Sequence, residues 1–124
     1  MTELGNKDLS GRVIEAAIKV HQTLGPGFLE SVYENALCIE FKNRGLRFER
    51  QKSVKLFYEG EHRLDLLVEG CLLIELKAVK AIEDVFFAIG RSYMKAISVD
   101  DGLLLNFASM PLGIRRIGRE WFPS

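Results

Sequence analysis

Hydrophobic positions first repeat with helical spacing along this 124-residue chain. Apolar residues recur every three to four positions over residues 9–23, with Ser10 as the expected N-cap, and again over residues 29–44. Between these segments, Gly25-Pro26-Gly27 predicts a turn. We therefore expect two helices at the start of the chain, after a short frayed stretch over residues 1–7.

The pattern then changes to alternation, which predicts strands over residues 54–58, 62–68 and 71–77. Helical spacing returns over residues 82–96, and the apolar run at residues 103–107 predicts a buried strand. Residues 114–121 follow as a last strand or an edge. This order is typical of an α/β fold, a mixed sheet in which an antiparallel meander is completed after a crossover helix.

Composition narrows the class of protein. The length suits one domain over residues 1–124, and a hydrophobic content of 48% excludes a disordered chain. No apolar run approaches the roughly 18 residues of a membrane span, and no signal segment opens the sequence. Cys38 and Cys71 form no CxxC pair, so we expect reduced thiols in a cytoplasmic protein. The balance of 17 Lys+Arg against 17 Asp+Glu argues against a generally basic nucleic-acid binder.

The most informative stretch is the hairpin over residues 63–77. A three-residue loop at Glu69-Gly70-Cys71 pairs Val68 with Leu72, whereas a two-residue loop would mix the two faces of the strands. The three-residue loop is favoured because it gathers all the apolar even positions on one face, which is expected to cover the core: Leu64, Leu66, Val68, Leu72, Ile74 and Leu76.

This register sets two acids against each other. Asp65 lies opposite Glu75, with Cβ atoms about 4.5–5.5 Å apart, an arrangement that is repulsive unless a positive charge intervenes. Lys77 follows on the same face. Hard divalent cations take carboxylate ligands, polarise phosphoryl oxygens and lower the pKa of a bound water, and a lysine can orient that water or stabilise developing charge. The alternative is that these three residues form an exposed cross-strand charge group.

Two motifs carry a resemblance to a known family. Residues 27–33, Gly-Phe-Leu-Glu-Ser-Val-Tyr, match a GxxExxY signature, and the hairpin matches a D…ExK element. With Glu-Arg-Gln at residues 49–51 and IELKAV at residues 74–79, nearly the whole chain resembles the GxxExxY family of the PD-(D/E)xK nuclease superfamily. The resemblance implies a restriction-endonuclease-like core and a metal-dependent nuclease that hydrolyses phosphodiester bonds, with DNA ahead of RNA as substrate. It also leaves a homodimer open.

Carried over residue by residue, the resemblance gives four candidate catalytic residues. Asp65 and Glu75 match the metal-binding acids, with Mg²⁺ or Mn²⁺ as the expected cofactor. Lys77 matches the motif lysine that assists the attacking water, and Glu30 matches the acid of the helix before the sheet. From the residues alone, Glu30 reads as a helix-start glutamate stabilised by the helix dipole. Tyr33 ends the signature without an assigned role.

One position departs from the family pattern. The helix after ExK often carries a Gln four residues before a Tyr; if Tyr93 is that Tyr, Ile89 replaces the Gln and cannot hydrogen-bond a ligand. This departure favours the alternative function, a catalytically weak or inactive nucleic-acid-binding or protein-interaction module that retains the fold. Basic residues are grouped at 44–55, 77–95 and 115–119, where a polyanion would dock unless they form an ordinary solvated surface.

Overall fold

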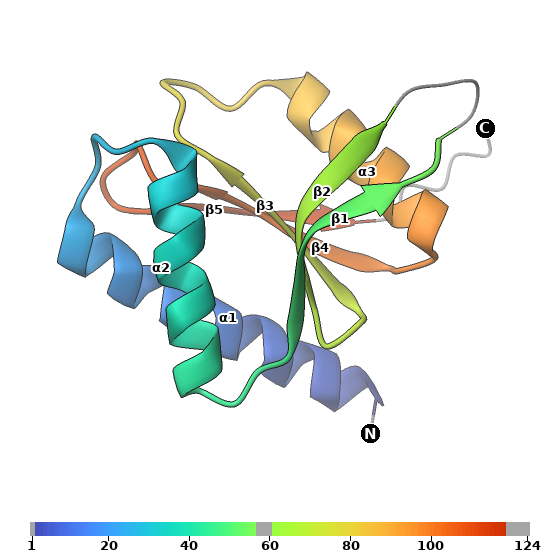
Figure 1. Ribbon diagram of the computed structural model, residues 1–124. Coiled ribbons are helices and arrows are strands. Elements are labelled where there is room, and N and C mark those ends of the chain that lie inside the picture. Colours follow the sequence, from blue (N-terminus) through green and yellow to red (C-terminus); the bar gives the residue numbers. More distant parts are fainter. Residues whose placement is uncertain (1, 57–60, 119–124) are drawn as a thin grey trace.

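A mixed five-stranded sheet with helices on both faces organises the protein in the computed structural model, which describes residues 2–56 and 61–118 (Figure 1). The strand order is β1-β2-β3-β4-β5, in which β3 and β4 run parallel and the other neighbours are antiparallel. The predicted α/β architecture is confirmed, with α3 as the crossover connection between β3 and β4. The elements are α1 (Thr2–Leu24), α2 (Glu30–Asn43), β1 (Phe48–Val54), β2 (His62–Val68), β3 (Leu72–Lys77), α3 (Asp84–Ile97), β4 (Asp101–Asn106) and β5 (Gly113–Gly118).

Helix α1 begins earlier than the sequence pattern predicted. It starts at Thr2, so residues 2–7, which we expected to fray, are helical, and Ser10 lies buried inside the helix instead of capping it. No proline interrupts this stretch, so nothing in its backbone chemistry forces a later start. The second helix agrees with its prediction: α2 follows the glycine-proline-glycine turn, in which Gly25 and Gly27 take positive φ values.

The sheet separates two hydrophobic cores. Figure 1 shows α1 and α2 on one face of the sheet and α3 on the other. The first core packs under α1 and α2 and includes Val13, Ala17, Val20, Tyr33, Leu37, Phe41, Leu66, Val68, Ile74 and Leu105. The second core packs under α3 and includes Val54, Leu64, Leu67, Leu73, Tyr93, Met94, Leu104 and Ile117. Strand β4 is apolar on both faces because it lies between the two cores.

The register predicted for the β2–β3 hairpin is confirmed. Val68 pairs with Leu72 and Leu66 pairs with Ile74, the pairing expected from a three-residue loop. The prediction for Leu64 was wrong, because this residue packs in the second core while Leu66 packs in the first. The alternation along β2 therefore breaks at the residue between them, Asp65.

Strand β1 lies upstream of the predicted strand at residues 54–58. It ends at Val54, and residues 57–58 and the predicted turn residues Glu59 and Gly60 lie outside the described residues. The pattern was misleading because β1 is an edge strand with exposed charged residues at its centre. In addition, Phe48 packs against the first core and Val54 in the second, although both are even positions. Because β1 changes face along its length, its buried residues do not alternate regularly in the sequence.

The remaining elements agree with their predictions to within two or three residues. The last strand is β5, and positions 119–121 of its predicted range lie outside the described residues. In the described part of the chain, none of the helices combines the length and the apolar character that a membrane crossing requires.

Candidate functional site

Asp65 and Glu75 face each other where the β2–β3 ladder gives way to side-chain hydrogen bonds. The Asp65 N–H donates to Glu75 Oε2 at 3.0 Å, and the Leu76 N–H donates to Asp65 Oδ2 at 2.7 Å. Each carboxylate therefore accepts a bond from the backbone of the opposite strand. This exchange fixes one oxygen of each acid and keeps the two side chains together.

Burial perturbs the ionisation of both acids. Only 5% of Glu75 is exposed, and this burial, with the negative charge of Asp65 beside it, raises the pKa of Glu75 to about 8. Burial also raises the pKa of Asp65, although the hydrogen bond from the Leu76 backbone opposes the shift. Near neutral pH the pair therefore retains a proton that two exposed carboxyl groups would lose.

Lys77 lies two residues beyond Glu75, at the end of β3. Its ammonium group stands over the ring of Phe86 on α3, with Nζ 4.6 Å from the ring centroid. A cation over an aromatic face is held by the ring quadrupole. The contact fixes the amine on the side of the sheet that α3 covers.

Glu30 reaches the same region from α2, of which it is the first residue. Its side chain is exposed, and Oε2 accepts the Ala78 N–H at 3.3 Å, one residue beyond Lys77. The helix start and the end of β3 are thereby joined. The structure thus brings all four predicted site residues around the carboxyl end of β3 and the interrupted ladder.

Tyr33, to which the sequence assigned no role, holds the turn before α2. Its hydroxyl donates to the Gly25 carbonyl at 2.6 Å and accepts the Phe28 N–H at 3.1 Å, while its ring stacks on Phe107 at 4.5 Å. These contacts fix the segment from which Glu30 emerges. Tyr33 therefore holds the backbone just before Glu30.

Asn106, which the sequence analysis did not single out, secures the loop after β3. Its Oδ1 accepts the N–H groups of Val79 and Ala108, and its Nδ2 donates to the Val79 carbonyl at 2.9 Å. The side chain is buried, and its amide supplies hydrogen bonds that a strand pair would otherwise provide. No spacing signal marks this role, because it depends on the parallel pairing of β3 with β4.

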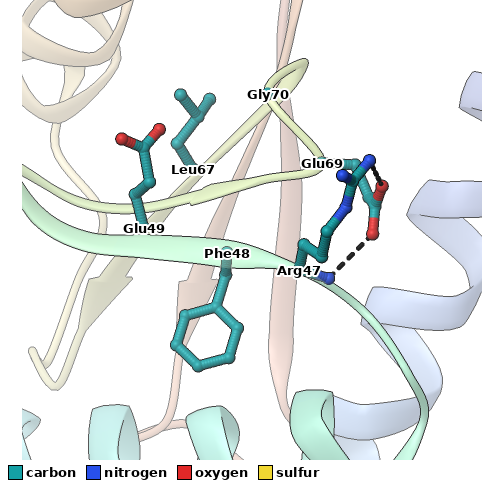
Figure 2. A pocket seen from close by; sticks show the side chains of 6 residues that line it. All are labelled: Arg47, Phe48, Glu49, Leu67, Glu69 and Gly70. Carbon is teal, nitrogen blue, oxygen red and sulfur yellow. Dashed lines mark hydrogen bonds and ion pairs between the residues drawn. The ribbon is translucent and has the colours of Figure 1, made fainter.

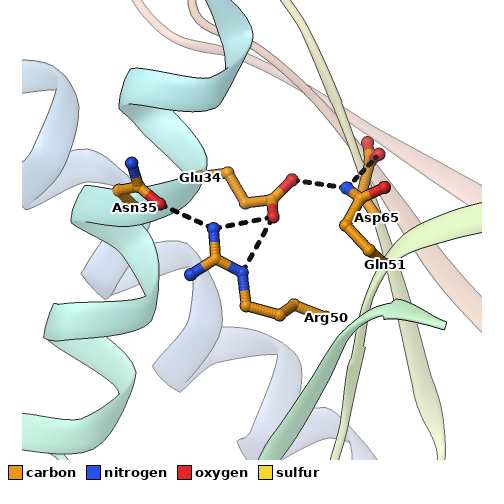
Figure 3. Close-up of polar contacts among 5 residues, drawn as sticks. All are labelled: Glu34, Asn35, Arg50, Gln51 and Asp65. Atoms are coloured by element: carbon orange, nitrogen blue, oxygen red, sulfur yellow. Dashed lines mark hydrogen bonds and ion pairs between the residues drawn. The ribbon is translucent and has the colours of Figure 1, made fainter.

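A third carboxylate, Glu34, lies close to Asp65 and was also missed. Figure 3 shows Glu34 on α2 between Arg50 and Gln51 of β1, with Asp65 beyond the glutamine. Arg50 and Gln51 both donate to Glu34, at 3.0 and 2.8 Å, and Gln51 Nε2 also lies 3.5 Å from Asp65 Oδ1. Arg50 and Gln51 belong to the Glu-Arg-Gln segment that carried part of the family resemblance. This segment is the only signal in the sequence for their contacts with Glu34.

The basic groups predicted for polyanion docking are used largely within the protein. In the group at residues 44–55, most members form ion pairs at 3.0 to 3.5 Å: Arg44 with Glu40, Arg47 with Glu69, Arg50 with Glu34 and Lys52 with Glu49. In the last group, Arg115 lies over the Phe87 ring at 5.3 Å. The pair of Arg47 with Glu69, in which the guanidinium is largely exposed, can open at small cost, whereas Arg50 is held by the buried carboxylate of Glu34.

A pocket of about 280 Å³ opens at the other end of the β2–β3 hairpin (Figure 2). In it, the Glu69 carboxylate accepts the backbone N–H of Arg47 at 2.7 Å and pairs with its guanidinium at 3.1 Å, and the backbone bond lowers the pKa of Glu69. It contains none of the four predicted site residues. Its lining residues are Arg47, Phe48, Glu49, Leu67, Glu69 and Gly70.

The residues at the interrupted ladder fit a hard divalent cation. Asp65 and Glu75 are oxygen donors held together, and a cation between them would offset the repulsion and burial that raise their pKa values. Within the described residues, no group of three or more His, Cys, Asp or Glu side chains is gathered for a metal. Water and phosphate oxygens would therefore complete the coordination, as is usual for Mg²⁺.

Comparison with known proteins supplies a family. A family model described as "PD-(D/E)XK nuclease superfamily" matches residues 7–117. A search of the curated proteins finds no match. Among solved structures, the crystal structure of SSO0001 is similar with a TM-score of 0.55 and 12% sequence identity, covering 75% of this chain and 51% of that chain. At this identity the likeness shows the fold alone, and this chain spans about half the length of that one.

Proposed function

The chain belongs to the PD-(D/E)XK nuclease superfamily, and from this premise we propose that it is a metal-dependent nuclease acting on phosphodiester bonds. We also propose that it is one domain of the GxxExxY group, on the match at residues 27–33. DNA is the first substrate to test, ahead of RNA, and a homodimer is the first assembly. We propose a cytoplasmic location, in which the thiols of Cys38 and Cys71 stay reduced.

The observation that carries the proposal is the pairing of Asp65 with Glu75. Two carboxylates held against each other by the opposite strand's backbone, with a pKa of about 8 for Glu75, are costly without a cation. Strongly perturbed acids cluster at functional sites, because catalytic groups need pKa values matched to their task. Lys77 and Glu30 at the same end of β3 add the other charged groups of the superfamily's reaction.

Each residue has a distinct part in the proposed reaction. Asp65 and Glu75 would hold Mg²⁺ or Mn²⁺, and the bound ion would supply Lewis acidity toward a phosphate oxygen and a more acidic water. Lys77 orients the attacking water or stabilises negative charge developing on the phosphate. Glu30 assists at the edge of the site while its hydrogen bond to Ala78 holds the end of β3 in place.

The alternative function is a nucleic-acid-binding or protein-interaction module with little or no catalysis. Ile89 favours it, because this residue lies on α3 with 38% of its surface exposed and offers no hydrogen bond to a ligand. The two functions differ in metal binding. Millimolar Mn²⁺ should bind a nuclease site measurably by calorimetry, whereas the module requires no cation.

Cleavage of single- and double-stranded DNA and RNA, in Mg²⁺ or Mn²⁺ and in EDTA, tests the proposal. Lys77→Ala should lower the rate at least about 100-fold, and Glu75→Gln should weaken Mn²⁺ binding. Lys42→Ala is the matched control, because this exposed lysine of α2 lies outside the three basic groups. Cleavage that survives Lys77→Ala unchanged, or that persists in EDTA, would refute the assignment.

A further inference from the structure

Arg50 and Gln51 are neighbours in β1, yet both side chains reach the carboxylate of Glu34 (Figure 3). Adjacent side chains of a regular strand point to opposite faces of the sheet. The backbone must therefore depart from strand geometry between them. It does so at Gln51, whose φ of 51° lies in the left-handed region.

This conformation is unfavourable for glutamine, because its Cβ comes too close to the following carbonyl oxygen. Gln51 also lies directly across from one particular residue of β2. The ladder pairs on either side, Arg50 with Leu66 and Lys52 with Leu64, set Gln51 across from Asp65. Backbone strain that persists in a folded protein is often connected with function. Here it lies beside one of the two perturbed acids.

The side chain of Gln51 connects two carboxylates. Its Nε2 donates to Glu34 Oε1 at 2.8 Å and lies 3.5 Å from Asp65 Oδ1. The other oxygen, Asp65 Oδ2, accepts the Leu76 N–H. Arg50 pairs with Glu34 at 3.0 Å and compensates its buried charge. Glu34 in turn holds the Gln51 amide with its Nε2 directed at Asp65.

The geometry points to Gln51 as a positioning residue, whose amide, held by Glu34, orients the Asp65 carboxylate for metal binding; Arg50 in turn holds Glu34. The inference rests on the proposed function, in which Asp65 is a metal ligand. Partners that orient a ligating carboxylate typically change metal affinity about 10- to 100-fold when they are removed. Because the contact with Asp65 is long, the effect should be near the lower end of that range.

Gln51→Gly separates orientation from stability. Glycine adopts the left-handed conformation without strain, so the fold should be retained while the amide is lost. Gln51→Asn is the second variant, because asparagine tolerates positive φ but its amide is one methylene shorter. Ser53→Gly, an exposed position of the same strand, is the matched control for a glycine in β1.

Two measurements on the full chain complete the test. Calorimetry with Mn²⁺ alone should show affinity reduced about tenfold in Gln51→Gly, and unchanged in Ser53→Gly. Hydrogen exchange followed by NMR without metal should show the Leu76 amide exchanging roughly fivefold faster in Gln51→Gly. That amide reports the orientation of Asp65, because Oδ2 is its acceptor.

The outcomes separate the inference from the proposed function. Weaker Mn²⁺ binding together with faster exchange of the Leu76 amide in Gln51→Gly supports the positioning role. Wild-type Leu76 exchange in both Gln51 variants overturns it, as does a loosened Leu76 amide with undiminished Mn²⁺ affinity. If the wild-type protein binds no Mn²⁺, the metal-dependent function fails, and with it the positioning of Asp65 for a metal.

Discussion

The raised pKa of Glu75 makes the free energy of unfolding depend on pH. An acid whose pKa is raised by folding stabilises the native state fully below its ordinary pKa of 4.5, and this contribution is lost as the pH rises through about 8. Between these values the native state binds up to one proton more than the unfolded chain. Stability should therefore fall by up to about 1.4 kcal/mol per pH unit, or about 3 kcal/mol from pH 5 to pH 7.

Glu75→Gln is the perturbation that tests this reasoning. Glutamine does not titrate, and its side-chain oxygen can still accept the Asp65 N–H that Glu75 accepts. The dependence on pH should become much weaker, with a remainder from Asp65, whose pKa is also raised by burial. Glu15→Gln, at an exposed position of α1, is the control and should keep the full slope.

Urea denaturation at pH 5, 6 and 7 in EDTA measures the effect. With an m-value of about 1–3 kcal/mol/M, a loss of about 3 kcal/mol lowers the midpoint by at least about 1 M, well above error. A Glu75→Gln variant that loses stability with pH as steeply as the wild type would refute the reasoning. The proton would then reside on another group.

Three further predictions concern the metal, Phe86 and Tyr33. Saturating Mn²⁺ should flatten the pH dependence of wild-type stability, because a bound cation favours the ionised carboxylates, and denaturation with and without metal shows this. Phe86→Leu should lower the cleavage rate by up to about tenfold, because the cation–π contact that holds Lys77 is lost. Phe87→Leu, which removes the ring under Arg115 instead, should not lower it, and a rate assay compares the two variants. Tyr33→Phe should cost about 1–2 kcal/mol, read from urea midpoints, because two hydrogen bonds are lost while the ring stack remains.

The sequence predicted the β2–β3 hairpin well because local chemistry determines it. The turn around Gly70 and the apolar alternation select one register, and a slip of one residue would expose the core face. The position of β1 and the packing of Leu64 could not be predicted in this way. Both depend on a change of face at Gln51 and Asp65, which results from one backbone angle and an interrupted ladder.

The candidate site divides in the same manner. Asp65, Glu75 and Lys77 could be selected from one hairpin, because its register brings residues 65 and 75 together even though the alternation breaks at Asp65. Glu30 required the family resemblance, since an acid at a helix start is common for other reasons. Glu34 and Asn106 were missed because their roles arise from contacts between distant segments, which leave no periodic trace in the sequence.

The change of face in the β1–β2 hairpin also bears on how the protein unfolds. One end of the hairpin packs against the first core, through Phe48 and Val68, and the other end packs in the second, through Val54 and Leu64. The same two strands thus belong to both hydrophobic layers, and neither layer can lose them without disturbing the other. Opening of the layer under α3 should therefore be coupled to opening of the layer under α1 and α2, in one cooperative transition. The two strands pass from one layer to the other at Gln51 and Asp65. The residues that couple the two layers therefore lie beside the paired carboxylates of Asp65 and Glu75.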